Sequence, residues 1–525
     1  MTIPDAWPYA DGAEADGPHT VGRWIADRAA SAPHRIAIDD RGVTIAYGEL
    51  ESRARSLSDR LRAAGYGPGD RVATVSGNSI DHVVAFFGCA KAGVAFMPLS
   101  WRLSPRELSE VLLASRPSLV LVEDEYRTLA ADALGRLDAA PVAVPLGTLG
   151  AEARLDRRAD VVAPRRAVCD DDPLLVIHTS GSEAAPKGVV LTHANCFWNN
   201  LALAGAITLT ADDVVLAMLP QFHVAAWNCQ PLLAWWVGAT VVLERAFQPE
   251  RVLQLVAERA VTAMMGVPTQ YHLMSRDARF SAAALSSVRV ALVGGATMPA
   301  EVAAAWADAR TPLTQGYGLT EAAPNVLWHA AGESAGAVGR PYPYVDVRLT
   351  DVESGLPLDG EAEGELWVRG PSVFAGYLHD AEATHRAMSD GWLRTGDVLR
   401  RDAEGIFRVV DRLKDIYISG GENVAPAEVE HALCLHPAVA AAAVVGVADP
   451  VWGERGVAFV VRAPAAALSE DEVLAHARRE LAGFKVPVRV AFVDEIPRST
   501  IEKIARSRLR ARAAALLEEE THEHH

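Results

Sequence analysis

Residues 178–193 read HTSGSEAAPKGVVLTH and directly follow an apolar run, LLVI, that predicts a buried strand. The segment combines glycines and small hydroxyl side chains with a single lysine, Lys187, and such groups can hold phosphate oxygens through N–H, O–H and ammonium donors. It is not a Walker A loop, because Pro186 stands where that motif needs glycine and Gly188 where it needs a hydroxyl. A carboxylate, Glu183, lies in its middle, and a polar surface turn is the alternative interpretation of the segment taken alone.

The segment lies within a chain of alternating helical and apolar-strand patterns, which predict parallel sheets covered by helices. This alternation fills the first 170 residues or so and repeats over Pro220–Val293. From about residue 345, short strands with Gly/Asp turns (YVDVRLTD, GELWVRG, GIFRVVD) predict a β-rich subdomain. After Arg412–Asp415, a helix and a strand begin a compact α+β unit. We therefore predict an α/β fold with a large N-terminal domain, residues 1–411, and a small C-terminal domain, residues 412–525.

Composition and charge exclude several classes of protein. The chain has 525 residues, of which 50% are hydrophobic and 22% charged, and its net charge of −17 argues against a nucleic-acid-binding protein. Five scattered cysteines without a CxxC pair indicate a reducing compartment, and we expect a cytoplasmic protein without a secretion signal. The apolar run Ala225–Leu243 is broken by Pro231 and Gly238, so it predicts a buried helix followed by a buried strand rather than a membrane span.

Lysine is rare in this chain. Among 50 basic residues the lysines are Lys91, Lys187, Lys414, Lys485 and Lys503, and arginine occupies the other basic positions. A lysine that remains in such a composition marks a place where a compact ammonium is needed and a planar guanidinium is not equivalent. Four of the five lie in motif-like stretches, which favours selection over chance.

Further motif-like segments follow in the second half of the chain. They are LVGGATMP with Gly294 and Gly295, TQGYGLTE with Glu321, DGWLRTGD with Asp397, DRLKD with Arg412, and PRSTIEKIAR with Lys503. A glycine pair after a strand lets a flat ring approach the backbone, and a carboxylate suits a Mg²⁺ ion that bridges phosphates. A carboxylate and a guanidinium are the usual partners of ribose hydroxyls. Together these segments predict a nucleotide site.

With these motifs in this order, the sequence resembles the adenylate-forming superfamily of acyl-CoA synthetases, adenylation domains and luciferases, from about residue 20 to about residue 512. The resemblance implies ATP, Mg²⁺ and coenzyme A, and a carboxylic acid that is activated as an acyl-adenylate. Mg²⁺ and an aligned ammonium would neutralise the charge that develops when the carboxylate attacks the α-phosphate. The resemblance also implies that the C-terminal domain is mobile and rotates about a hinge at Lys414 between the two half-reactions.

The resemblance assigns roles to individual residues. The ATP phosphate loop would comprise Thr179, Ser180, Gly181, Ser182 and Lys187, and the adenine would lie against Gly294, Gly295, Ala296, Gly316 and Tyr317. Thr320 would lie near the α-phosphate, Glu321 would bind Mg²⁺, and Asp397 and Arg412 would hold the ribose. Lys503 would contact the substrate carboxylate and the α-phosphate, and His223 would be the aromatic gate of the acyl site; with Thr320 and Glu321 these two form the expected catalytic set. Gly420 and Gly421 would line a pantetheine tunnel, and Lys485 lies near the domain contact without a catalytic role.

The sequence departs from the family pattern in two places. Ser182-Glu183-Ala184 stands where the family commonly has Thr-Thr-Gly, and Glu502 replaces the usual glycine before Lys503. We expect the Glu183 carboxylate to point away from the triphosphate while the backbone holds the phosphates.

The residues between Gln221 and Leu243 bear on the substrate. Between Gln221 and Leu243 there is no acidic residue, which disfavours an amino acid substrate, because its ammonium would need a buried carboxylate. The expected pocket residues are small or apolar and favour a bulky hydrophobic acid, whether aryl, polycyclic or fatty: Ala225, Ala226, Trp227, Gly295 and Ala322. An acid–CoA ligase is therefore predicted. A ligase that loads an acyl carrier protein, a non-catalytic acyl-adenylate-binding protein and a homodimeric assembly all stay open.

Overall fold

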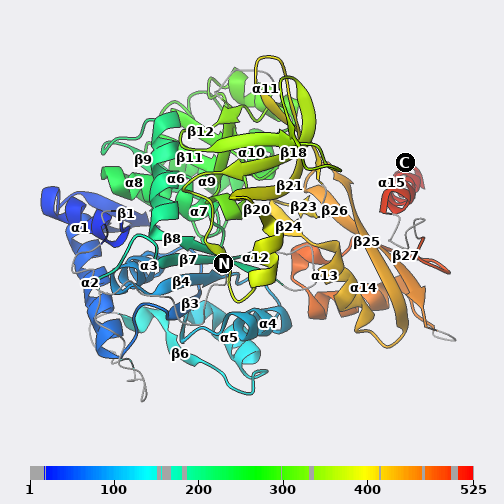
Figure 1. Cartoon of the computed structure of the whole chain (residues 1–525), viewed down its shortest axis with the longest axis horizontal. Helices are drawn as coiled ribbons and strands as arrows, with labels where there is room; N and C mark the ends of the chain where they lie inside the picture. The colour runs from blue at the N-terminus through cyan, green and yellow to red at the C-terminus, as the bar shows by residue number, and fades with distance from the viewer. Residues whose placement is uncertain are drawn as a thin grey trace. The chain divides into compact units, whose positions relative to one another are not determined.

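The computed structural model describes residues 17, 19–149, 155, 167–179, 186–296, 298–329, 336–412, 416–463, 467–497 and 506–523. The chain divides into two compact units (Figure 1). Unit 1 comprises residues 1–101, 112–178 and 188–411, and unit 2 comprises residues 102–111, 179–187 and 412–525. The sequence interpretation also divides the chain at residue 412, but it assigns the two short segments of unit 2 to the N-terminal domain.

The first sheet of unit 1 has nine strands, in the order β15-β14-β13-β12-β11-β9-β10-β1-β2. Its strands are β1 (Ile36–Asp40), β2 (Val43–Ala46), β9 (Val214–Ala217), β10 (Thr240–Leu243), β11 (Ala263–Gly266), β12 (Val290–Val293), β13 (Thr314–Gly318), β14 (Asn325–His329) and β15 (Arg340–Pro341). The six strands from β13 to β1 are parallel. Apolar side chains of α9 (Pro249–Glu258), α10 (Pro268–Ser275) and α11 (Ala300–Asp308) form a common core with this sheet.

The second sheet of unit 1 has seven strands, in the order β19-β8-β7-β4-β3-β5-β6. They are β3 (Arg71–Val75), β4 (Ala95–Leu99), β5 (Leu119–Val122), β6 (Val142–Pro145), β7 (Pro173–Thr179), β8 (Lys187–Thr192) and β19 (Gly376–Tyr377). Helices α1 (Gly22–Ser31), α2 (Tyr47–Ala63), α3 (Ile80–Ala92), α6 (His193–Ala206) and α8 (Pro231–Val237) contribute to one continuous core with both sheets. This is the alternation of helices and parallel strands that the sequence predicts.

The β-rich part of unit 1 is a six-stranded antiparallel sheet in the order β17-β16-β18-β21-β20, with β22 paired to β21. Its strands are β16 (Asp346–Thr350), β17 (Pro357–Leu358), β18 (Ala362–Arg369), β20 (Met388–Ser389), β21 (Trp392–Arg401) and β22 (Phe407–Arg412). Tryptophan and arginine side chains alternate on one face, where Arg348 stacks on both Trp367 and Trp392.

Unit 2 is built around a five-stranded sheet, with the order β24-β23-β26-β25 and β27 beside β26. Its elements are β23 (Tyr417–Ser419), β24 (Glu422–Val424), β25 (Val439–Asp449), β26 (Gly453–Arg462), β27 (Arg489–Phe492), α13 (Pro426–Cys434), α14 (Glu470–Glu480), η4 (Gly483–Lys485) and α15 (Arg506–Glu523). Side chains of α13 and α14 pack in one core with this sheet, while Leu509 and Ala513 of α15 pack in a second one. Residues 102–111 add the start of α4 (Pro105–Ser115) to this unit.

The apolar run Ala225–Leu243 forms α7 (Ala225–Asn228), α8 and β10. The prediction of buried helix followed by buried strand is confirmed, and Pro231 and Gly238 begin and end α8 as helix-start and helix-stop residues do. No helix among the described residues is long and apolar enough to span a membrane.

Candidate functional site

The residues expected around the adenine lie at the carboxyl ends of two adjacent parallel strands. Strands β12 and β13 pair with Val293 opposite Gln315, so Gly294 follows beside Gly316. A Cβ atom on Gly294 would lie 3.4 Å from the Gly316 carbonyl oxygen. Gly295 has φ +85°, a left-handed backbone that favours glycine, and it is exposed. Ligands of parallel sheets bind at this edge, so the structure brings these glycines together where a ligand could reach them.

The residues expected to hold adenine and ribose are in direct contact. Tyr317 in β13 is buried, and its hydroxyl donates a hydrogen bond of 2.7 Å to Oδ2 of Asp397 in β21. The backbone N–H of Asp397 donates in turn to the Thr395 hydroxyl, 3.1 Å away. The Tyr317 hydroxyl therefore orients the Asp397 carboxylate, and Thr395 fixes the Asp397 backbone. The β-rich sheet supplies this residue, which is 80 positions from Tyr317 in sequence.

The motif TQGYGLTE continues from β13 into a short 3-10 helix, η3 (Thr320–Ala322). Gly318 is needed for a close backbone crossing, since a Cβ atom there would lie 1.6 Å from the Pro324 carbonyl oxygen. Thr320 and Glu321 are both half-buried. The crossing places both side chains immediately after the end of β13.

The Glu321 carboxylate has one oxygen held by the protein and one that is not. Oε1 of Glu321 accepts a hydrogen bond of 2.7 Å from the Tyr377 hydroxyl, and the backbone carbonyl oxygen of Glu321 accepts one of 2.8 Å from the Phe374 N–H. No hydrogen bond reaches Oε2 from the residues that the structure describes. Burial and the neighbouring Glu321 carboxylate raise the pKa of Tyr377, so the phenol stays a donor.

A single half-buried carboxylate fits a magnesium ion better than it fits a softer metal. Mg²⁺ prefers oxygen ligands and is usually held by one or two carboxylates together with substrate phosphates and waters. The described part of the chain contains no group of three His, Cys, Asp or Glu side chains that could hold a metal without a substrate. The free oxygen of Glu321 is thus a suitable protein ligand for a metal that arrives with a nucleotide.

The ends of the expected phosphate loop are described, and its centre is not. Thr179 ends β7 and Lys187 begins β8, and both are half-buried. Ser180, Gly181, Ser182, Glu183 and Ala184 lie outside the described residues, so the outward orientation of Glu183 stays a prediction. Gly188 is tightly enclosed, since a Cβ atom there would lie 3.2 Å from side-chain atoms of both Leu378 and Val176.

The expected acyl segment is divided between a surface turn and the core. His223 lies half-buried in the turn before α7, with its ring 4.6 Å from that of Phe222. Trp227 is fully buried, stacks on Phe86 at 4.5 Å and donates from Nε1 to the Gln221 carbonyl. Its indole is therefore part of the core packing.

A second expected pocket segment lies next to α7. Asn228 at the end of α7 donates from Nδ2 to the Ala323 carbonyl at 2.9 Å, so α7 lies next to η3, the helix that contains Ala322. Ala226 and Ala322 are buried, and Ala225 and Ala296 are half-buried.

In unit 2, Gly420 and Gly421 form the two-residue turn between β23 and β24. Their φ values of +60° and +87° are those of a type I′ hairpin turn, which glycine favours. A Cβ atom on Gly420 would also lie 2.7 Å from the Trp452 ring. Arg412 ends β22, while Lys414, Glu502 and Lys503 lie outside the described residues, so their expected roles stay predictions.

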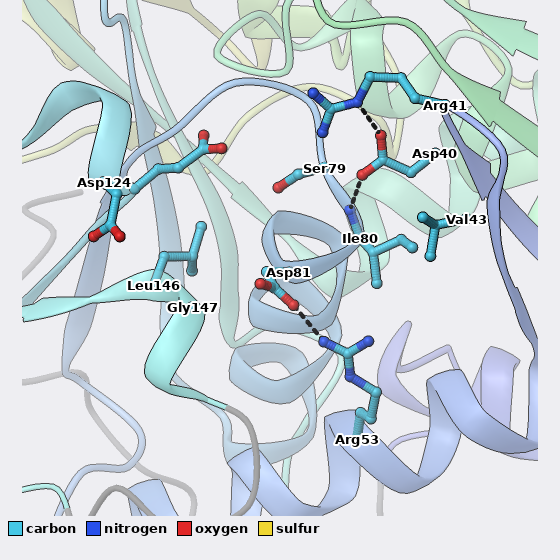
Figure 2. A pocket seen from close by; sticks show the side chains of 11 residues that line it. Asp40, Arg41, Val43, Arg53, Ser79, Ile80, Asp81, Asp124, Leu146 and Gly147 are labelled. Carbon is cyan, nitrogen blue, oxygen red and sulfur yellow. Dashed lines mark hydrogen bonds and ion pairs between the residues drawn. The ribbon is translucent and has the colours of Figure 1, made fainter.

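A separate cavity of about 690 Å³ opens where β1 and β5 end and α3 begins (Figure 2). It is lined by four acidic side chains that are each paired with an arginine: Asp40 with Arg41, Asp81 with Arg53, Glu123 with Arg245, and Asp124 with Arg127. Because these charges are already neutralised within the protein, we assign no ligand to this cavity.

Sequence reasoning missed two residues of the candidate site. Tyr377 reaches Glu321 across 56 positions, and Asn228 reaches Ala323 across 95. Tyr377 lies in the short strand GY, which carries no signal of its own. Asn228 is an amide in an otherwise apolar segment, and this is the one feature that could have drawn attention to it.

Comparison with known proteins extends these observations over most of the chain. A family model described as AMP-binding enzyme matches residues 25–378, and one described as AMP-binding enzyme C-terminal domain matches residues 428–503. Feruloyl-CoA synthase from Amycolatopsis sp is 42% identical over 497 residues, which cover 94% of this chain and 99% of that protein. Indoleacetate–CoA ligase from Aromatoleum aromaticum is 34% identical, with coverage of 93% and 97%.

Solved structures agree in fold as well as in length. The o-succinylbenzoate CoA synthetase from Bacillus subtilis, a double mutant bound with a product analogue, matches with a TM-score of 0.83 and 27% identity. The match covers 93% of this chain and 98% of that one. The chain therefore belongs to the family of AMP-binding enzymes, as the order of its motifs predicts.

Proposed function

We propose that this protein is an ATP-dependent carboxylic acid–CoA ligase that forms an acyl-adenylate with release of pyrophosphate and then transfers the acyl group to the CoA thiol with release of AMP. The observation that carries the proposal is the arrangement at the end of β13. There Tyr317 contacts Asp397, and Glu321 follows with one free carboxylate oxygen. The family membership and the CoA-ligase relatives support the same reaction.

In this proposal each described residue has a limited task. Gly294, Gly295 and Gly316 provide a flat backbone surface for the adenine, and Asp397 accepts hydrogen bonds from the ribose hydroxyls. Glu321 offers Oε2 to a metal ion, which when bound neutralises negative charge on the phosphates during attack by the substrate carboxylate. Thr320, one residue earlier, supplies a hydroxyl on the same short helix.

The remaining tasks belong to cationic residues. Lys187 contributes an ammonium at the phosphate end of the site, and Arg412 a guanidinium at the ribose. Lys503 is assigned to the bond-forming step, where its ammonium holds the substrate carboxylate against the α-phosphate. Lys414 is the proposed hinge, and the Gly420–Gly421 turn is the proposed wall of the pantetheine tunnel.

For the acid, we propose an aryl carboxylate. The relatives at 42% and 34% identity are named for ferulate and indoleacetate, which are both carboxylic acids that bear an aromatic ring on a short side chain. The segment from His223 to Trp227 offers small or apolar side chains and no carboxylate, which suits an aromatic ring better than an amino acid. A carrier-protein phosphopantetheine is the alternative acceptor, since it would present the same thiol.

The test is a panel of aryl, polycyclic, fatty and amino acids, with each acid scored for ATP-dependent pyrophosphate release and then for thioester formation with free CoA by mass spectrometry. We expect aryl acids to give both products, and Lys503→Ala to abolish pyrophosphate release while ATP binding persists. If no acid yields pyrophosphate, the proposed ligase activity is wrong. If acids yield pyrophosphate but no CoA thioester forms, the acceptor assignment is wrong.

A further inference from the structure

We propose that Tyr377 is a positioning residue for this reaction, which fixes the Glu321 carboxylate so that only Oε2 is presented to a metal ion. The inference rests on the proposed function, because that function gives Glu321 its task. The carrying observation is the hydrogen bond of 2.7 Å from the Tyr377 hydroxyl to Glu321 Oε1.

Tyr377 is itself rigidly held. Its backbone pairs with Val189 in the β19–β8 ladder, and its N–H donates to the Thr384 hydroxyl at 2.9 Å. Its ring packs edge-on against Phe374 at 4.9 Å, and only 6% of the residue is exposed. A phenol anchored by sheet pairing, a side-chain acceptor and aromatic packing has little freedom, so its hydroxyl defines a fixed point for the carboxylate.

Glu321 is held less firmly by its own element. It lies in a 3-10 helix of three residues, and a helix this short imposes little on the side chain. The segment that contains Tyr377 supplies both anchors, one to the Glu321 carbonyl from the Phe374 N–H and one to Oε1. Because the phenol hydrogen-bonds to Oε1, Oε2 is the oxygen that would be presented to a metal ion.

The same segment is also joined to the strand that leaves the expected phosphate loop. The N–H groups of Ala375 and Leu378 donate to the carbonyls of Val190 and Gly188, at 3.0 and 2.7 Å. Both acceptors belong to β8, where Gly188 directly follows Lys187 and Val190 lies two residues further on. Residues 374–378 therefore connect the Glu321 carboxylate to β8 through hydrogen bonds. The task that we infer for Tyr377 is to keep this carboxylate in a fixed position relative to β8.

A purely structural role for Tyr377 makes a different prediction. A buried phenol needs an acceptor whatever its function, and loss of such a bond costs about 1 kcal/mol of stability. Tyr47 is the matched control, since it is also a buried tyrosine of unit 1 and donates to a backbone carbonyl, that of Ala239, at 2.6 Å. Tyr47→Phe and Tyr377→Phe should lower the melting temperature alike, but only Tyr377→Phe should change metal binding.

The decisive measurement is Mn²⁺ binding by electron paramagnetic resonance, with a non-hydrolysable ATP analogue, in wild type, Tyr377→Phe and Tyr47→Phe. Loss of a hydrogen bond that orients a metal ligand typically weakens metal binding by about 10- to 100-fold, and we expect that range for Tyr377→Phe alone. In the pyrophosphate assay the Mg²⁺ concentration for half-maximal rate should rise by the same factor, with the KM of the acid unchanged and the rate recovered at high Mg²⁺. Equal Mn²⁺ affinity in wild type and Tyr377→Phe would overturn the inference.

A double-mutant cycle tests whether Tyr377 acts through Glu321. Glu321→Gln should weaken Mn²⁺ binding, and adding Tyr377→Phe to it should cause no further loss. Additive losses would show that the phenol affects the metal by another route and would also overturn the inference. Failure of the proposed function is distinguishable, because wild type would then release no pyrophosphate with any acid while the Mn²⁺ comparison still decides the role of Tyr377.

Discussion

Lys485→Met should destabilise unit 2 strongly. The lysine is 4% exposed, and its Nζ lies 2.8 Å from Glu107 Oε1 and 2.6 Å from Glu428 Oε1. Both carboxylates are buried as well, and all three residues belong to unit 2. Burial alone would lower the pKa of Lys485, but the two carboxylates outweigh it and raise that pKa above its ordinary value. The ammonium is therefore charged and compensates two anions.

The magnitude follows from what the substitution leaves behind. Removal of one partner from a buried ion pair costs about 3–5 kcal/mol, because the remaining charge is buried without compensation. Methionine has about the length of lysine but no charge, so the carboxylates of Glu107 and Glu428 would lie next to an apolar methyl group without a compensating cation. Since about 1.4 kcal/mol corresponds to a factor of ten, opening of unit 2 should become between about 100-fold and a few thousand-fold more frequent.

Hydrogen exchange followed by mass spectrometry measures this opening locally, in peptides from β25 and β26, while the rest of the chain serves as an internal reference. Lys91→Met is the matched control, because Lys91 pairs with Glu51 at 2.7 Å within unit 1 and should not affect those peptides. Exchange in β25 and β26 within about threefold of wild type would refute the reasoning.

The pH dependence of the variant provides a second readout. Burial raises the pKa of Glu428 even against the opposing effect of Lys485, and without the ammonium the pKa should rise further. A carboxyl whose folded pKa is raised is most favourable when protonated, so its contribution is present at low pH and lost as pH rises. The loss of unit 2 stability in Lys485→Met, relative to wild type, should therefore become smaller as the pH falls from 8 to 5. The triple variant Lys485→Met/Glu107→Gln/Glu428→Gln should regain most of the lost stability.

Three further predictions concern the two units separately. Tyr317→Phe removes the bond to Asp397 and should raise the KM for ATP about fivefold to tenfold, with the KM of the acid unchanged; equal ATP kinetics would contradict this role. Gly420→Ala forces a Cβ against Trp452 at a φ of +60° and should slow thioester formation about tenfold while pyrophosphate release stays at the wild-type rate, and a parallel loss of both would contradict it. Burial lowers the pKa of both His82 and His178 to about 4, so each neutral imidazole contributes stability above about pH 6.5 that is lost as pH falls toward 4; each should cost unit 1 roughly 2 kcal/mol between pH 7.5 and 5 in calorimetry, and His82→Gln should remove about half of that slope.

Local patterns made the fold predictable wherever one element is defined by its own residues. The run IDHVVAFFGCAKA has a helical pattern that ends at Gly93, and the structure has α3 ending there with a left-handed glycine cap. The assignment of residues 102–111 to unit 2 could not be predicted in this way. It involves contacts such as the ion pair between Lys485 and Glu107, which are 378 positions apart, and no periodicity carries that information.

In the candidate site, too, some residues are recognisable from a local pattern and others are brought in only by contacts between distant segments. Gly294 and Gly316 are each recognisable after or within a strand pattern, and the adjacency of β12 and β13 then brings them together. The contacts that orient the polar groups are different, since Tyr317 meets Asp397 of another sheet, and Tyr377 of the seven-stranded sheet meets Glu321 of η3. The motifs nominate candidate groups such as Tyr317, Asp397 and Glu321, whereas Tyr377, which holds the Glu321 carboxylate, comes from a segment with no motif.

Two of the five lysines of the chain, Lys91 and Lys485, are enclosed by oxygen acceptors. Lys91 belongs to no recognised motif, yet its Nζ lies 2.7 Å from both the Glu51 carboxylate and the Gly22 carbonyl, and Gly22 packs directly against its stem. Lys485 is enclosed in the same manner by two carboxylates. In both places a compact ammonium fits where the broader guanidinium fork would not. At these two positions, therefore, the lysine that was retained has its ammonium surrounded by carboxylate or carbonyl oxygens. In the proposed function, the oxygens around Lys187 and Lys503 belong to the phosphates of ATP and to the carboxylate of the acid.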